Sequence, residues 1–252
     1  MGFDLKSISS GKRSLPPRIV LLGTPKVGKT TFACQAPNAI VLPIKGEEGV
    51  DDIEVAKFPT AERLEDVFQA LETLAHEDHN FRFVVIDSAS ALERLVFEYV
   101  CRHNNWQNIE SPGYGKGYAT AVSGWVEVIN RLDVLRNTRG MGSILIGHVA
   151  VKSCNDPLLD QPFDQWIWDV NTKASSTLLK WADCCLFARK KAIVMKKEGS
   201  AKAYGEDKRV LLTQERPSHP GGGRGVYGHL PYELPLEWNA WMEAIAQNNT
   251  NN

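Results

Sequence analysis

The chain has 252 residues, 43% of them hydrophobic, and a formal net charge of −1, a composition typical of globular proteins. It contains no apolar stretch near the about 20 residues that cross a bilayer, and its charge excludes the overall basic field of many DNA-binding proteins. Five scattered cysteines without zinc-ligand spacing, and no apolar signal-peptide core at the start, favour a cytoplasmic location.

The first part of the chain carries the most informative motif. Residues 1–17 are polar and close with Pro16-Pro17, which predicts a flexible arm. Residues 18–22 form a short apolar run typical of a buried strand, and residues 31–36 suit a helix that Pro37 would end. Between them, residues 23–30 read G-x-x-x-x-G-K-T, the phosphate-binding loop (P-loop) of nucleotide-binding proteins.

Each position of this loop has a physical task. Gly23 and Gly28 let the backbone close around a phosphate, where a side chain would collide. Lys29 can reach the β- and γ-phosphates, and the Thr30 hydroxyl can bind Mg²⁺. We therefore expect ATP with Mg²⁺ to be bound by Gly23, Thr24, Pro25, Lys26, Val27, Gly28, Lys29, Thr30 and Thr31.

The remaining elements alternate between strands and helices. Apolar runs predict strands at 39–42, 81–88, 143–148, 183–188, 192–197 and 208–214. Helical periodicity predicts helices at 61–75, 91–103, 119–138, 174–181 and 236–246, followed by a disordered tail at 247–252. This alternation predicts one α/β domain over 18–246, with a mostly parallel sheet flanked by helices on both faces.

Polar side chains follow three of the predicted strands, and the carboxyl ends of parallel strands share one edge of a sheet. Asp87 ends an apolar strand, as a Mg²⁺-binding acid would, although an acid there can also cap the next helix. Glu47 and Glu48 follow the second strand, and either can orient an attacking water or be a solvated loop acid. His148 is a candidate sensor of the γ-phosphate or a hydrogen-bonded core histidine.

Two long polar segments, 104–118 and 150–172, are predicted as loops. Connections of this length are commonly either functional or disordered. They carry aromatic rings that can stack on bases and cations that can meet phosphates, the chemistry of single-stranded nucleic-acid binding. The alternative is that the tryptophans pack on the protein body. The candidates are Tyr114, Lys116, Tyr118, Lys152, Trp166, Trp168 and Lys173.

The late segment 189–224 holds ten basic and four acidic side chains, a net charge of +6. Such a run is either a solvated face or a surface that binds polyanions or a neighbouring subunit.

These motifs together resemble RecA-type ATPases, and more narrowly the phage-encoded, core-only RecA-like ATP-binding proteins, some of which act as single-strand annealing proteins or recombinases. The resemblance covers about residues 18–225 and includes Glu47-Glu48-Gly49-Val50-Asp51, which has the family's spacing for a catalytic glutamate. The chain departs from the family at Lys26, where many members have glycine, and at His148, where RecA has glutamine.

The resemblance implies a RecA-like P-loop NTPase core with Lys29 and Thr30 as the Walker A residues, Asp87 as the Walker B acid, Glu47 as the catalytic base and His148 as the γ-phosphate sensor. It implies Mg²⁺-dependent ATP hydrolysis and assembly on single-stranded DNA as a homo-oligomeric ring or filament, with a single-strand binding protein as a further partner. A basic residue of a neighbouring subunit would complete the site, with Lys208, Arg209 and Arg216 as candidates.

Two other functions stay open at this point. The near-neutral net charge also suits an accessory ATPase or switch that acts on protein partners in replication or packaging. A small-molecule phosphotransferase is disfavoured, because such P-loop kinases carry an arginine-rich lid and residues 150–172 contain no arginine.

Overall fold

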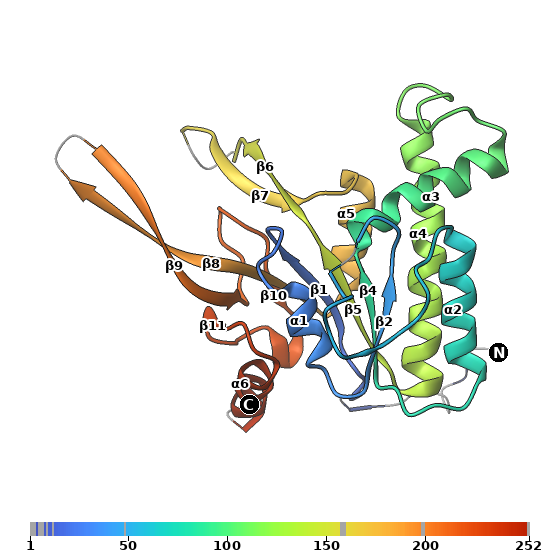
Figure 1. The fold of residues 1–252 in the computed structure, drawn as a ribbon, viewed down its shortest axis with the longest axis horizontal. Coiled ribbons are helices and arrows are strands. Elements are labelled where there is room, and N and C mark those ends of the chain that lie inside the picture. The colour runs from blue at the N-terminus through green and yellow to red at the C-terminus, as the bar shows by residue number, and fades with distance from the viewer. Residues whose placement is uncertain are drawn as a thin grey trace.

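The computed structural model describes residues 4, 8, 10–11, 13–47, 49–156, 160–197 and 200–250, with backbone alone for 192–197, 200–206 and 250. Its centre is a nine-stranded sheet in the order β11-β9-β8-β1-β5-β4-β2-β3, with β10 paired to β8 (Figure 1). All neighbours from β8 to β3 are parallel, and the pairs β8–β9, β9–β11 and β8–β10 are antiparallel. A separate two-stranded sheet joins β6 and β7.

The parallel strands are short, and those at the centre are buried on both faces, as their unbroken apolar sequences require. They are β1 (Arg18–Gly23), β5 (Gly142–Gly147), β4 (Phe83–Asp87), β2 (Ala39–Pro43) and the two-residue edge strand β3 (Ala56–Lys57). The antiparallel part consists of β8 (Cys184–Lys197), β9 (Ser200–Leu212), β10 (Gly222–Gly223) and β11 (Glu233–Pro235). Figure 1 shows β8 and β9 as a ribbon that projects from the body.

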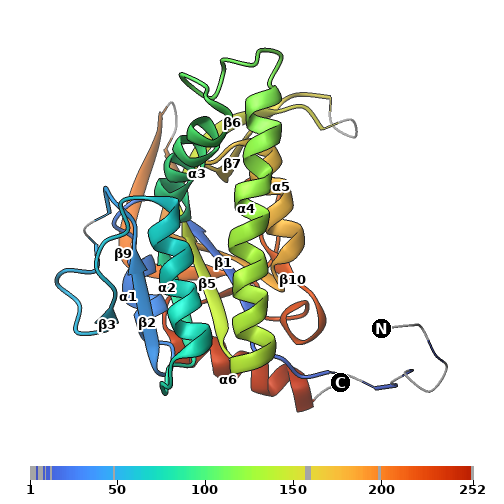
Figure 2. The same ribbon diagram turned by 90° about the vertical axis from the view of Figure 1, so that its right-hand side faces the viewer.

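Helices cover both faces of the sheet. One face carries α2 (Leu64–His76), α3 (Ala89–Asn104), α4 (Lys116–Val134) and α5 (Thr172–Trp181), and a π-helical turn, η2 (Leu135–Arg139), continues α4. Figure 2 shows α2 and α4 side by side over the strands. The other face carries α1 (Lys29–Cys34) and α6 (Trp238–Thr250), and a 3-10 turn, η3 (Gly225–Tyr227), precedes β11. The predicted α/β class, with a mostly parallel sheet between two helical layers, is confirmed.

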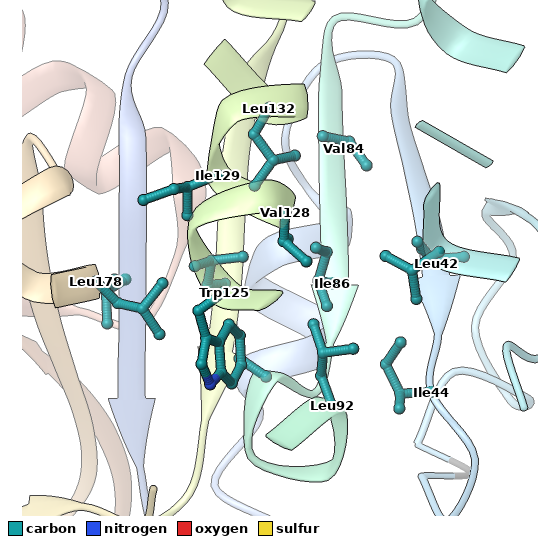
Figure 3. Packing of buried hydrophobic residues seen from close by; sticks show 14 of the residues in the cluster. Leu42, Ile44, Val84, Ile86, Leu92, Trp125, Val128, Ile129, Leu132 and Leu178 are labelled. Atoms are coloured by element: carbon teal, nitrogen blue, oxygen red, sulfur yellow. The ribbon is translucent and has the colours of Figure 1, made fainter. Parts of the chain in front are cut away.

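Two hydrophobic clusters hold these layers together, one on each face of the sheet. In the larger cluster, Trp125 of α4 is fully buried and packs toward Ile86 of β4 (Figure 3). The predicted stripe of α2 is buried at Leu64, Val67 and Leu71. Burial of a large aromatic side chain stabilises the fold by a few kcal/mol, so this layer holds the strand ends rigidly in place.

The structure corrects one predicted loop. The segment 150–172 contains a β-hairpin, β6 (Val149–Cys154) and β7 (Phe163–Trp168), with a register that joins Val149 to Trp168 and Cys154 to Phe163. Its strands are rich in β-branched and aromatic residues, which favour extended structure. Pro162 lies just outside β7, where the missing N–H costs no ladder bond. Pro162 therefore marks the end of the connection and does not make the whole segment a loop.

Other boundaries also differ from the prediction. The predicted strands 183–188 and 192–197 are one strand, β8, with a register shift between Lys190 and Ala192. Helix α4 begins at Lys116, so the preceding loop is shorter than predicted. Helix α6 continues to Thr250 and includes residues 247–250, which the sequence assigns to a disordered tail. Its inner face buries Trp241, Ala244 and Ile245 against the second cluster, and this packing stabilises the helix despite its polar end.

Candidate functional site

A cavity of about 410 Å³ lies at the carboxyl edge of the parallel strands. Its lining includes Lys29, Thr30, Glu47, Asp87 and His148. Strands β1, β4 and β5 end beside it, with β5 lying between the strand of the glycine loop and the strand of Asp87. The predicted convergence of the glycine loop with the polar residues at the strand ends is therefore confirmed, except that Glu48 lies outside the described residues.

The two glycines of the loop are required by geometry. A Cβ atom on Gly23 would lie 2.3 Å from the carbonyl oxygen of Ala188, so no side chain fits there. Gly28 has a left-handed φ of 104° and is the N-cap of α1, without a capping side chain. The first amide groups of the helix therefore have no side-chain acceptor at this end, a configuration suited to binding an anion together with the loop.

Lys29 is buried, with 5% of its surface exposed, and lies inside the loop. Its Nζ donates to the carbonyl oxygens of Gly23 and Thr24, both at 2.9 Å. Burial lowers the pKa of Lys29 to about 8, against the opposing attraction of Asp87 and Glu47. The ammonium group therefore remains predominantly charged at neutral pH and is positioned by the loop that would surround a phosphate.

Asp87 and Thr30 form the second part of the site. The Thr30 hydroxyl donates to Asp87 Oδ2 at 2.7 Å. Burial raises the pKa of Asp87, while the Thr30 hydrogen bond opposes the shift. The helix-capping alternative for Asp87 is wrong, because the N-cap of α3 is Ser88, whose hydroxyl accepts from the amide of Ala91 at 3.2 Å.

This pair fits a magnesium ion. Among the described residues, no group of three or more His, Cys, Asp and Glu side chains gathers as a metal cage. Mg²⁺ commonly takes only one or two protein oxygens and fills its other positions with water and substrate phosphates. The adjacent hydroxyl and carboxylate of Thr30 and Asp87, at the mouth of the glycine loop, provide such a partial set of ligands.

Glu47 and His148 form the third part of the site and are hydrogen-bonded to each other. His148 Nε2 lies 2.9 Å from Glu47 Oε1, which also accepts from the Ser88 hydroxyl at 2.7 Å. The hydrogen bond from His148 lowers the pKa of Glu47, so this carboxylate is ionised at neutral pH. Since Glu47 only accepts, Nε2 carries the proton in neutral His148, and Nδ1 is left to face Lys29 Nζ at 3.5 Å.

Two serines hold the Glu47–His148 pair in place and were not among the predicted site residues. Ser88 orients Glu47, and the Ser90 hydroxyl accepts from the backbone amide of His148 at 3.0 Å and from Trp168 Nε1 at 3.3 Å. Ser90 thus joins the end of β5 to the β6–β7 hairpin. The only signal in the sequence that pointed to them was their closeness to Asp87, since Ser88 follows it directly and Ser90 lies in the first turn of α3.

The predicted DNA-binding residues of the first loop differ in exposure. Tyr114 is fully exposed at 103%, and Lys116 at the start of α4 is also exposed. Tyr118 is only partly exposed, because its ring meets Phe97 edge-on at 5.5 Å and its hydroxyl donates to Glu110 at 3.0 Å. Of the three predicted residues, Tyr114 and Lys116 are therefore the two that are exposed to a ligand.

The predicted residues of the second segment are also divided. Lys152 on β6 and Lys173 on α5 are exposed, and Trp166 is partly buried against the larger cluster. Trp168 is 2% exposed and bonded to Ser90, so it is a core residue and its ring cannot stack on a base in this structure. The tryptophan-packing alternative therefore holds for Trp168.

The three basic candidates for action on a neighbouring subunit occupy different places. Arg209 on β9 lines the cavity of its own chain. Lys208 is exposed beside it. Arg216 lies over the ring of Tyr232, 4.7 Å from its centroid. Other charges of the same segment are also paired within the chain, since Lys191 meets Glu233 at 2.7 Å.

Comparisons with known proteins place the chain in a family. The model of the AAA domain family matches residues 15–225. No curated protein matches the sequence. Among solved structures, the crystal structure of the RadB recombinase is similar, with 15% sequence identity, a TM-score of 0.42, and coverage of 79% of this chain and 81% of that chain. Within the described residues, no helix is long and apolar enough to pass through a bilayer.

Proposed function

We propose that this chain, which belongs to the AAA domain family, binds ATP with Mg²⁺ and hydrolyses it in order to control binding to single-stranded DNA, and promotes annealing or strand exchange in phage recombination. The observation that carries the proposal is the single cavity in which a glycine loop, the Thr30–Asp87 pair and the Glu47–His148 pair face one another. A host cytoplasm would be its place of action.

Each residue of the cavity has a proposed task in hydrolysis. The loop amides and Lys29 would bind the phosphates, and Thr30 and Asp87 would hold Mg²⁺, which neutralises phosphate charge when bound. Glu47 would orient the attacking water and accept its proton. The hydrogen bonds from Ser88 and His148 both go to Glu47 Oε1 and hold the carboxylate at the lining of the cavity.

The DNA part of the proposal is supported by the end of the molecule beyond this cavity. Figures 1 and 2 show the loop before α4 and the β6–β7 hairpin at the same end of the molecule. Tyr114 lies on this loop and Lys152 on this hairpin, Lys116 begins α4 and Lys173 lies on α5, and all four are exposed. Trp168 connects the hairpin to Ser90, and Ser90 bonds the backbone of His148. The state of the nucleotide would reach the DNA surface along this chain of contacts.

A filter-binding titration with single-stranded DNA tests the proposal. We expect ATP to tighten DNA binding, and we expect the affinity to fall steeply as salt is raised, because phosphate contacts release counterions. A protein without single-strand affinity, both with and without ATP, would exclude the DNA role. Negative-stain images with DNA and a slowly hydrolysed ATP analogue would show rings or filaments if the chain assembles as a homo-oligomer.

The burial of Trp168 favours a second candidate, since it removes one of the stacking residues on which DNA binding was predicted. In this alternative, the chain is an accessory ATPase or switch that acts on protein partners in replication or packaging. Affinity capture from cells with nuclease treatment separates the two. A partner that survives nuclease supports the alternative, whereas a single-strand binding protein lost on digestion supports the DNA role.

A further inference from the structure

We propose that Arg209 and Lys26 bind the phosphates of the nucleotide held in their own subunit, so that the site carries its second and third cations in cis. This inference rests on the proposed nucleotide site; it adds Arg209 to that site and assigns a specific contact to the Lys26 side chain. Arg209 was predicted to act on a neighbouring subunit, and Lys26 was predicted among the ATP-binding loop residues, although the extra charge at this departure from the family pattern had no assigned role.

Arg209 reaches the glycine loop from the root of the β8–β9 ribbon. Its Nη1 lies 2.9 Å, and its Cδ 3.7 Å, from the point that a Cβ atom on Gly28 would occupy. The absence of a side chain at Gly28 therefore makes room for the guanidinium group as well as for a phosphate. The backbone of Arg209 is held on both sides, by pairing with Lys190 of β8 and by the amide of Leu236, which donates to its carbonyl oxygen at 3.3 Å.

Lys26 belongs to the glycine loop and also lines the cavity. It has a left-handed φ of 60°, which is uncommon for a residue with a side chain and costs some conformational energy. The side chain is exposed and lines the cavity together with Thr31 and Arg209. Glycine would adopt this conformation at lower cost, so the presence of lysine here is best explained by its charge.

Neither cation is used elsewhere in the fold. Across the part of the chain that the structure describes, the side chains of Arg209 and Lys26 form no hydrogen bond or ion pair. Their neighbours in the ribbon differ, because Lys190 pairs with Asp207 at 3.7 Å and Lys191 with Glu233 at 2.7 Å. A guanidinium group held rigidly at its backbone, with its planar donors free, is well suited to phosphate oxygens.

The charge balance of the cavity lining also favours a phosphate-binding role for Lys26 and Arg209. Without them, the side chains of the described lining carry one positive charge, on Lys29, against two carboxylates, Glu47 and Asp87. Lys26 and Arg209 reverse this balance. Because Arg209 belongs to β9, phosphate binding would also fix the root of the ribbon relative to the glycine loop. The position of the ribbon would then depend on whether nucleotide is bound.

The first experiment is a titration of the full-length protein with a fluorescent ATP analogue in the presence of Mg²⁺. We expect Arg209→Ala and Lys26→Ala each to weaken binding by about tenfold or more, the usual loss for a hydrogen bond to a charged group. Lys190→Ala is the matched control, since Lys190 is a cation of the same ribbon that pairs with Asp207 and is not among the residues that line the cavity. Arg209→Lys should recover part of the affinity, and the melting temperatures of all variants should stay close to that of the wild type.

The second experiment separates action within a subunit from action between subunits. Lys29→Ala protein, which keeps Arg209 but should not bind nucleotide, is added in excess to Arg209→Ala protein. Unchanged weak binding supports the inference, and restored binding would overturn it in favour of a neighbour's arginine. Wild-type binding that depends on Lys29, with Arg209→Ala and Lys26→Ala both equal to Lys190→Ala, would also overturn it. If wild type and Lys29→Ala both fail to bind, the proposed nucleotide site itself is wrong.

Discussion

Replacing Glu47 by glutamine separates nucleotide binding from hydrolysis. The amide oxygen of glutamine can still accept from the Ser88 hydroxyl, which donates at 2.7 Å, and the side chain has nearly the same volume. The substitution removes the negative charge and therefore the ability to take a proton from water. Binding of ATP should stay within about threefold of the wild type, since its phosphates would be held by the glycine loop and Lys29.

The expected loss in turnover follows from the role of a general base. Such a group typically accelerates a reaction by about 10²- to 10⁴-fold, which corresponds to about 3–5 kcal/mol in the activation free energy. The hydrogen bond from His148 keeps the pKa of Glu47 below its usual range, so the wild-type carboxylate is already ionised at pH 6. The wild-type rate should therefore show no loss from protonation of Glu47 between about pH 6 and pH 8.

The assay is steady-state release of phosphate at saturating ATP and Mg²⁺, paired with a direct binding titration. Glu62→Gln is the matched control, because Glu62 is an exposed glutamate that pairs with Lys45 outside the cavity lining. Turnover by Glu47→Gln equal to that of the wild type would refute the assignment and move the base to another carboxylate. Equal losses in binding and turnover would indicate a role in binding alone.

Three further outcomes follow from the same structure. Thr30→Ala should raise the Mg²⁺ concentration needed for half-maximal ATP binding by about tenfold. Thr30→Ser should stay near the wild type, because only the hydroxyl that meets Asp87 at 2.7 Å is needed. Equal effects of the two substitutions would contradict the metal role. Burial lowers the pKa of Lys29 to about 8, so the phosphate-binding ammonium form is lost as pH rises. ATP affinity measured by titration should be flat below about pH 7 and fall by up to about tenfold per pH unit above pH 8. A flat affinity profile up to about pH 9.5 would contradict the role of Lys29 in phosphate binding. Tyr114→Ala should weaken single-strand binding by about 1–3 kcal/mol without changing the melting temperature. Trp168→Phe should instead destabilise the fold by about 1–3 kcal/mol, because the hydrogen bond to Ser90 is lost. The reverse pattern in binding and denaturation assays would refute the assignment of Tyr114 to DNA binding and of Trp168 to the core.

Much of the site was predictable because it lies at strand ends. The glycine loop has a rigid spacing, and Asp87 and His148 each end an apolar run, so the parallel-sheet rule alone brings them to one edge. The side-chain partners were not predictable, since they depend on packing. Nothing in the sequence indicates that Ser88 and not Asp87 caps α3, or that Ser90 joins His148 to Trp168.

The antiparallel half of the fold was less predictable for a physical reason. Hairpin strands pair across a connection, and their register follows from turn geometry that composition does not specify. Pro162 was therefore interpreted as part of a loop, although it only borders β7. The course of β9 brings Arg209 back over Gly28, a contact between residues far apart in the chain that no local pattern reveals.

The most direct test of the account is the coupling between nucleotide and DNA. Fluorescence anisotropy of labelled single-stranded DNA, with and without a slowly hydrolysed ATP analogue, gives one ratio of affinities. Titration of the analogue with and without DNA gives the other, and thermodynamic linkage requires the two ratios to be equal. We predict a shared ratio of about ten or more that disappears in Lys29→Ala. A ratio of one in both titrations, with each ligand bound, would contradict the claim that the nucleotide controls DNA binding.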